Sequence, residues 1–315
     1  MGSKITDTIA TNGTDDYLKL KAIIRSLLDV VSYRAPTKED DHTRTLEKAV
    51  ALKVQSWNAD DGQNGVYFSL LSKAAASMVE ALYSRHPFEV KLAFALYVWF
   101  AFYIDDNPDR AVLEDYQRRV LLGLPQEESP VQHLHEVLGG LYQHWDPFCA
   151  NAMSCAALEF ITATVLEVRT EVSEMTVRPT ATRWPGYLRA KSGMAPGFSC
   201  AAFPTSGHPD ISSYIQVLPD MDDYICLVND ILSFYKEELV GENINYVHVR
   251  SKMTGKTPHR VLVEMVREVG DIHARIAATL AGHPEALASW EILEHGFIAW
   301  HFSIERYKLS QLHIC

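Results

Sequence analysis

The chain has 315 residues, with 29 lysines and arginines against 40 aspartates and glutamates, so its formal net charge is −11. Nucleic acids and anionic membrane surfaces favour basic patches, so this charge argues against both as partners. Hydrophobic residues make up 47% of the chain and charged residues 22%, which is the composition of an ordinary globular protein. The 5 cysteines are widely spaced and form no paired motif, which favours free thiols and a cytoplasmic location.

The N-terminal residues 1–16 are polar and rich in Thr, Asp, Gly and Asn, so we expect a flexible tail followed by a single domain at 17–315. This segment contains no apolar core typical of a signal peptide. The longest apolar run is Leu92–Ile104, which is shorter than the ~20 residues that a membrane-spanning helix needs. No membrane span is therefore expected.

From Tyr17 onward, hydrophobic residues recur with the helical period and strand patterns are nearly absent. Turns containing proline or glycine separate these segments, and none is long and polar enough to be an interdomain linker. We therefore predict an all-α fold, a bundle of about ten helices in one domain. The expected helices cover 17–33, 41–57, 65–84, 88–107, 111–123, 129–143, 146–171, 184–203, 210–239, 257–280 and 283–312.

The helix expected at 88–107 ends in an acidic run, Asp105-Asp106-x-x-Asp109, in which Pro108 terminates the helix. The C-terminal end of a helix carries partial negative charge, so adjacent carboxylates there are unfavourable unless a cation is bound. Carboxylate oxygens are the ligands that Mg²⁺ prefers. A solvated acidic turn after a core helix is the alternative interpretation.

A second set of oxygen ligands lies in the helix expected at 210–239. Asn229, Ser233 and Glu237 are spaced i, i+4 and i+8, so they project from one face over two turns. An amide oxygen, a hydroxyl and a carboxylate can bind one Mg²⁺, and Lys236 is close enough to reach an anion bound to that metal. The alternative is an ordinary polar helix face with an i,i+4 hydrogen bond.

Together these two motifs resemble the paired metal-binding motifs of class I terpene cyclases, and the chain is similar to the trichodiene-synthase-like sesquiterpene cyclases of fungi. The resemblance implies a class I terpenoid synthase bundle with a central active-site cavity. Besides the D-D-x-x-D run, it rests on Val228-Asn229-Asp230-x-x-Ser233-Phe234-Tyr235-Lys236-Glu237, on Tyr187-Leu188-Arg189, and on His295-Gly296-(x3)-Trp300-His301-(x4)-Arg306-Tyr307.

The resemblance implies that three Mg²⁺ ions hold the diphosphate group of farnesyl diphosphate at the mouth of the bundle. The implied metal-binding residues are Asp105, Asp106 and Asp109 of the first motif, with Asp105 as the direct ligand, and Asn229, Ser233 and Glu237 of the second. The implied diphosphate-binding residues, which with Asp105 make up the catalytic set, are Arg189, Lys236, Arg306 and Tyr307. Cationic and planar donors of this kind suit the concentrated charge of a leaving diphosphate.

Loss of diphosphate leaves an allylic carbocation, which needs a cavity that excludes water. Aromatic rings stabilise a cation by roughly 0.5–2 kcal/mol each, and Trp99, Phe102 and Trp300 are candidates for the lining, although core packing also explains them. Pro196 must break the helix after Gly193, because a proline inside a helix costs ~3 kcal/mol. The resemblance implies that this break faces the cavity; the alternative is a kink required for packing.

The expected function is therefore a Mg²⁺-dependent sesquiterpene cyclase, which ionises farnesyl diphosphate and cyclises the cation to a hydrocarbon or an alcohol. One alternative keeps this chemistry but uses geranyl or geranylgeranyl diphosphate. Another is a non-catalytic protein that binds isoprenoid diphosphates. The resemblance also allows a homodimer.

Overall fold

The computed structural model describes residues 3–36, 42–57, 65–106, 113–127, 129–242 and 244–314, without the side chains of residues 3–15 and Ser129. Within these ranges every regular element is a helix, which confirms the all-α prediction. The α-helices are α1 (Ser3–Val30), α2 (Thr43–Trp57), α3 (Gly65–Leu82), α4 (Phe88–Asp105), α5 (Tyr116–Leu121), α6 (Ser129–Gln132), α7 (Leu134–Leu141), α8 (Pro147–Val168), α9 (Thr170–Ser173), α10 (Trp184–Ser192), α11 (Ala195–Ala201), α12 (Leu218–Leu239), α13 (Tyr246–Thr254), α14 (Pro258–Leu280) and α15 (Pro284–Ser303). Short 3₁₀ helices cover Ile211–Ser213, Ile215–Val217, Glu305–Tyr307 and Leu309–Leu312.

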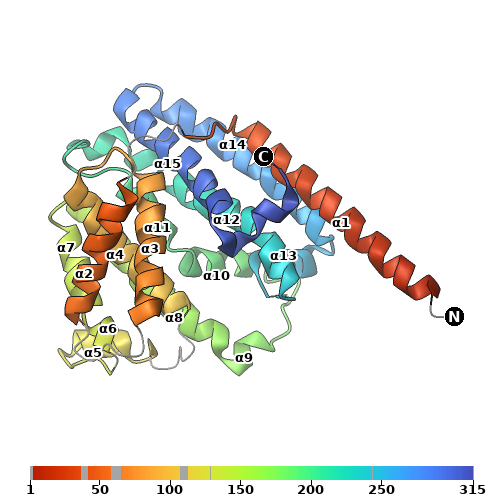
Figure 1. The fold of residues 1–315 in the computed structure, drawn as a ribbon, viewed down its shortest axis with the longest axis horizontal. Coiled ribbons are helices and arrows are strands. Elements are labelled where there is room, and N and C mark those ends of the chain that lie inside the picture. Colours follow the sequence, from red (N-terminus) through yellow and green to blue (C-terminus); the bar gives the residue numbers. More distant parts are fainter. Residues whose placement is uncertain are drawn as a thin grey trace.

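The long helices pack into a closed ring. Going around it, each helix contacts the next in the order α3, α4, α8, α11, α12, α14, α15 and back to α3. Outside the ring, α2 covers α3 and α4, while α1 lies along α14 and extends beyond the bundle at its N-terminal end (Figure 1). Helix α10 packs on α8, α12 and α13.

The middle of the ring is apolar because its helices are apolar on several sides. Helix α4 buries Phe94, Val98, Trp99 and Ile104 among other residues, as its composition predicts. Helix α15 approaches α3 very closely at Gly296, where an added Cβ atom would lie 2.0 Å from the carbonyl oxygen of Ala81. Only glycine allows these two helices to pack at this separation.

Several boundaries differ from the sequence predictions. The helix expected at 184–203 is broken, as Pro196 predicts, because Met194 adopts a left-handed conformation with φ 49° between α10 and α11. The segment expected at 129–143 forms two helices, α6 and α7, and the segment at 111–123 contains only the short α5. The helix expected at 146–171 divides into α8 and the short α9, and α13 was not predicted.

The N-terminal segment also differs from expectation in its conformation. The structure places residues 3–16, expected to form a flexible tail, in the first half of α1. The polar composition of this segment had favoured an irregular conformation over a helix. The expected flexibility of this segment stays a prediction.

Among the described residues, one helix is long and apolar enough to cross a membrane by length and composition alone. This helix is α8, and 56% of its apolar window is buried inside the bundle. Polar residues such as Asn151, Ser154 and Glu159 interrupt its sequence, so it contains no long continuous apolar run. A core helix packed between neighbours has the same properties, and α8 packs against α4, α7, α10 and α11.

Candidate active site

A cavity of about 540 Å³ opens beside the ends of α4 and α12, and it brings both sequence motifs together. Asp105, the last residue of α4, lines it from one side. Arg189 of α10 lines it together with Asn229 and Glu237, which α12 supplies two turns apart. Ser233 lies between these two on the same helical face, but it is buried and is not part of the cavity wall.

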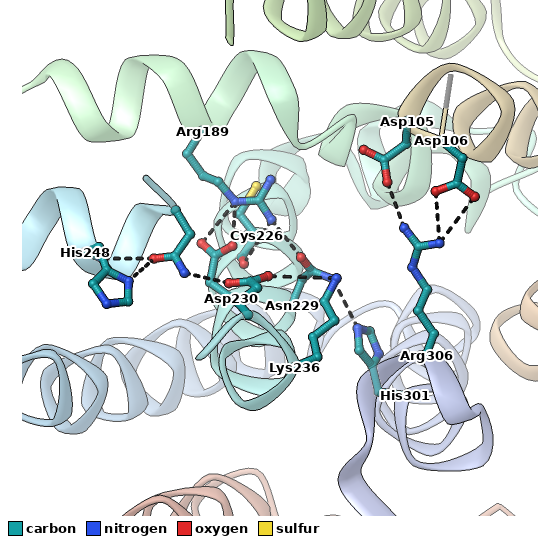
Figure 2. A network of polar contacts seen from close by, with 12 residues as sticks. Asp105, Asp106, Arg189, Cys226, Asn229, Asp230, Lys236, His248, His301 and Arg306 are labelled. Atoms are coloured by element: carbon teal, nitrogen blue, oxygen red, sulfur yellow. Dashed lines mark hydrogen bonds and ion pairs between the residues drawn. The ribbon is translucent and has the colours of Figure 1, made fainter. Parts of the chain in front are cut away.

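Arg189 is fixed to α12 by a buried ion pair. Its Nε donates to both carboxylate oxygens of Asp230, at 2.8 and 3.0 Å, and its Nη2 donates to the backbone oxygen of Cys226 and to Oδ1 of Asn229 (Figure 2). Burial by itself lowers the pKa of Arg189, but the charge of Asp230 outweighs it and raises that pKa. Burial raises the pKa of Asp230 to about 6. The guanidinium therefore stays charged at the cavity wall.

His301 of α15 fixes the orientation of the Asn229 amide. Its Nδ1 lies 2.7 Å from the backbone oxygen of Phe297, which can only accept a hydrogen bond, so Nδ1 carries the proton. Its Nε2 is then an acceptor for the Nδ2 of Asn229, at 3.1 Å. Burial lowers the pKa of His301 to about 4, so the ring is neutral. The amide oxygen of Asn229 consequently points away from α15, toward Arg189.

Glu237 lies one residue after Lys236 near the end of α12. Its Oε2 accepts a hydrogen bond from Nδ2 of Asn245 at 2.8 Å, and its Oε1 lies 3.9 Å from Nζ of Lys236. The Nζ of Lys236 also lies 5.2 Å from the ring centre of Tyr307, which places a cation on the face of an aromatic ring. Lys236 is therefore held near both the carboxylate and the C-terminal segment.

The acidic end of α4 contacts the C-terminal segment through Arg306. One guanidinium nitrogen lies 2.9 Å from Oδ2 of Asp105 and the other lies 3.2 Å from Oδ1 of Asp106 (Figure 2). Burial lowers the pKa of Arg306, but the carboxylates of Asp106 and Asp105 raise it by more. Asp109, the third acidic residue of this motif, lies outside the described residues.

The four residues expected to line the cavity do not form its wall. Trp99 is fully buried and stacks on Tyr103 in the core. Phe102 and Trp300 stack on each other at 6.1 Å, and Gly193 packs against Arg189. The three aromatic side chains therefore pack against other rings of the bundle. The expected place of all four residues in the lining of the active-site cavity stays a prediction.

The apolar wall comes from residues that the sequence did not single out: Phe160, Val172, Met175, Val177, Trp184, Pro185 and Leu188. Most of them lie on α8, on α10 or in the segment between these helices, and only Leu188 belongs to a string that carries the resemblance. His301 was present in the string that carries the resemblance, but only its contact with Asn229 shows what it does.

The oxygen atoms in the cavity wall and directly beside it fit a hard divalent cation. Asp105, Asn229, Ser233 and Glu237 offer carboxylate, amide and hydroxyl oxygens, all of them ligands that Mg²⁺ takes. In the ranges that the structure covers, no group of three His, Cys, Asp or Glu side chains could hold an ion by itself. Mg²⁺ commonly uses one or two carboxylates and completes its shell with water and phosphate oxygens.

This fold and this pairing of motifs define a class I terpenoid synthase. The family model described as "Trichodiene synthase (TRI5)" matches residues 68–313, which is most of the chain. The chain belongs to the trichodiene synthase family, and it is a terpene synthase.

Individual proteins that are similar to this chain are also named terpene synthases. Terpene synthase BipA of Cochliobolus sativus is 34% identical over 296 residues, covering 92% of this chain and 90% of the relative. Monoterpene synthase 25 of Postia placenta is 31% identical, covering 93% and 86%. Among solved structures, hedycaryol synthase in complex with nerolidol has a TM-score of 0.61 at 14% identity, covering 86% of this chain and 98% of that chain. At this identity the structural likeness concerns the fold alone.

Proposed function

We propose that this terpene synthase is a Mg²⁺-dependent sesquiterpene cyclase, which ionises farnesyl diphosphate and cyclises the resulting cation. The observation that carries the proposal is one cavity that joins Asp105 of the first motif to Asn229 and Glu237 of the second, with Arg189 between them. Membership of a family described by trichodiene synthase supports the fifteen-carbon substrate.

Cationic side chains surround the position proposed for the diphosphate. Arg189 reaches it from α10, Lys236 from α12, and Arg306 from the C-terminal segment beside Tyr307. Guanidinium groups bind several oxygens of a phosphate at once, and Lys236 adds a point charge. Bound Mg²⁺ would supply Lewis-acid stabilisation of the departing diphosphate. The role of the side chains is to orient the diphosphate and to stabilise its charge as the carbon–oxygen bond breaks.

The apolar wall holds the hydrocarbon part of the substrate. Phe160, Trp184 and Leu188 line the same cavity as the polar residues, so the prenyl chain and the diphosphate can lie in one continuous space. An apolar wall excludes water from the allylic cation, and an aromatic face stabilises it by roughly 0.5–2 kcal/mol. The fold of the prenyl chain in this space determines the product.

A shorter substrate is the second candidate. Monoterpene synthase 25, which is 31% identical, carries a name that points to ten-carbon products. Geranyl diphosphate would use the same diphosphate-binding residues and leave part of the cavity unfilled.

The test is a product assay with the purified full chain. Farnesyl, geranyl and geranylgeranyl diphosphate are incubated separately and in competition with Mg²⁺, and the extracts are analysed by gas chromatography. We expect a cyclic sesquiterpene from farnesyl diphosphate, with no product after chelation of Mg²⁺. Absence of any terpene from all three substrates would refute the proposal, and preference for geranyl diphosphate would establish the second candidate.

Two variants test the metal assignment. Asp105→Asn and Glu237→Gln should each lower kcat/KM at least about 100-fold, because each removes a charged metal ligand and leaves its volume unchanged. Glu264→Gln is the control, since Glu264 of α14 forms an ion pair with Lys256 and does not line the cavity. Equal turnover in all three variants would contradict the assignment.

A further inference from the structure

Asn245 connects the metal motif of α12 to the start of α13. It is the N-cap residue of α13, and its Oδ1 accepts a hydrogen bond from the backbone nitrogen of His248 at 2.9 Å. The same side chain donates from Nδ2 to Oε2 of Glu237 at 2.8 Å. One amide group therefore performs two functions, capping a helix and contacting a proposed metal ligand.

The cap determines which end of the amide faces Glu237. A backbone N–H can only donate, so the atom that faces His248 must be the amide oxygen of Asn245. The NH₂ group consequently points toward Glu237 and cannot be exchanged with the oxygen without breaking the cap. A carboxylate and an amide donor are a matched pair, and the charge on the acceptor strengthens the hydrogen bond.

The start of α13 is itself fixed to the end of α12. The ring of His248 stacks on Phe234 of α12 with centres 5.6 Å apart, and its Nε2 lies 3.0 Å from Oε1 of Glu238 (Figure 2 shows His248 beside this helix). Asn245 is therefore attached to a rigid support, so its NH₂ group has a defined position relative to Glu237.

The contact restricts Glu237 at a place where the helix offers little support. Glu237 lies two residues before the last residue of α12, and a glutamate side chain has several freely rotating bonds. With Oε2 held by Asn245, the other oxygen, Oε1, is directed toward Lys236. Glu237 and Asn245 both line the cavity, so this orientation is set at the proposed metal site itself.

We propose that Asn245 is a positioning residue of the metal site, which holds the carboxylate of Glu237 in the orientation that binds the cation. The inference rests on the proposed function, because it needs Glu237 to be a metal ligand. Hydrogen-bond partners of metal ligands change metal affinity by about 10- to 100-fold when they are removed. We expect a tenfold effect here, because the pair is partly exposed.

The experiment separates the donor from the cap. Asn245→Ser keeps an N-cap oxygen but has no NH₂ group at the distance of Glu237, whereas Asn245→Ala removes both functions. Binding of Mn²⁺, which takes the same oxygen ligands, is measured by electron paramagnetic resonance in the presence of inorganic pyrophosphate, with thermal unfolding in parallel. Thr257→Ala is the matched control, because Thr257 caps α14 and does not line the cavity.

The expected result is about a tenfold higher half-saturating Mn²⁺ concentration in both Asn245 variants, with a lower unfolding temperature in Asn245→Ala only. Thr257→Ala should lower the unfolding temperature and leave Mn²⁺ binding unchanged. Wild-type affinity in Asn245→Ser would overturn the inference, whether or not Asn245→Ala binds weakly, because the cap would then be the only function of Asn245. Failure of the wild-type protein to bind Mn²⁺ with pyrophosphate would instead overturn the proposed metal site.

Discussion

The close approach of α3 and α15 at Gly296 makes Gly296→Ala a strong test of the packing. The new methyl carbon would lie 2.0 Å from the oxygen of Ala81 and 2.7 Å from its carbonyl carbon, against the roughly 3.5 Å of an ordinary contact. Because these neighbours are backbone atoms, the two helices must separate by more than about 1 Å. Overpacking of this kind costs about 3 kcal/mol, and the higher helix propensity of alanine returns about 1 kcal/mol. The expected net loss is about 2 kcal/mol.

Thermal unfolding of the two proteins measures this loss. For a chain of 315 residues, 1 kcal/mol corresponds to about 1.5 °C, so Gly296→Ala should unfold about 3 °C below wild type. Gly139→Ala is the matched control, because Gly139 lies in α7 and an added Cβ atom there meets no atom within 4 Å. The control should unfold about 1 °C above wild type through helix propensity alone. Equal shifts in both variants would show that α3 and α15 do not pack as described.

Two further predictions concern buried charge. Asp230→Asn leaves the charge of Arg189 without its nearest partner and should lower the free energy of unfolding by about 3 kcal/mol. Adding Arg189→Met to this variant should recover part of that loss when all four proteins are compared by thermal unfolding. Additive effects of the two substitutions would contradict the ion pair. Burial lowers the pKa of His86 to about 4, so the unfolded chain binds the proton more readily than the folded one and stability falls as the pH decreases from 6.5 toward 4. At pH 5 the loss in the free energy of unfolding amounts to about 2 kcal/mol, so the stability of His86→Gln should fall less as the pH decreases. If His86→Gln loses stability with pH as wild type does, groups other than His86 cause the loss.

The sequence predicted the elements that depend on local pattern. The apolar composition of α4 is typical of a buried helix, as the structure has it, and Pro196 predicted the break between α10 and α11. The spacing of Asn229, Ser233 and Glu237 predicted one face of α12, because i, i+4 and i+8 depend only on helix geometry. In each of these cases the deciding interaction lies within one segment of the chain.

The wall of the cavity could not be predicted in the same way. Trp99 and Trp184 are both tryptophans in helices, yet Trp99 is buried against Tyr103 and Trp184 faces the cavity. The difference comes from how α4 and α10 are rotated within the ring, which depends on contacts with distant helices. The role of Asn245 could not be predicted for a similar reason. It requires α12 and α13 to meet at one point, and the sequence of α13 carries no strong helical pattern.

A net charge of −11 by itself disfavours an anionic ligand, and the ion pairs of the site explain how a diphosphate could bind nonetheless. Each cation assigned to the diphosphate lies beside a carboxylate: Arg306 beside Asp105, Arg189 beside Asp230, and Lys236 beside Glu237. A diphosphate arriving alone would meet these carboxylates as well as the cations, and a metal ion arriving alone would meet the cations. In the proposed function the two would exchange partners, because the metal would bind Asp105 and Glu237 while the diphosphate would bind Arg306 and Lys236, the cations beside these carboxylates. If the proposed function holds, the same ion pairs make metal and diphosphate binding mutually dependent, since coupling between two ligands is reciprocal.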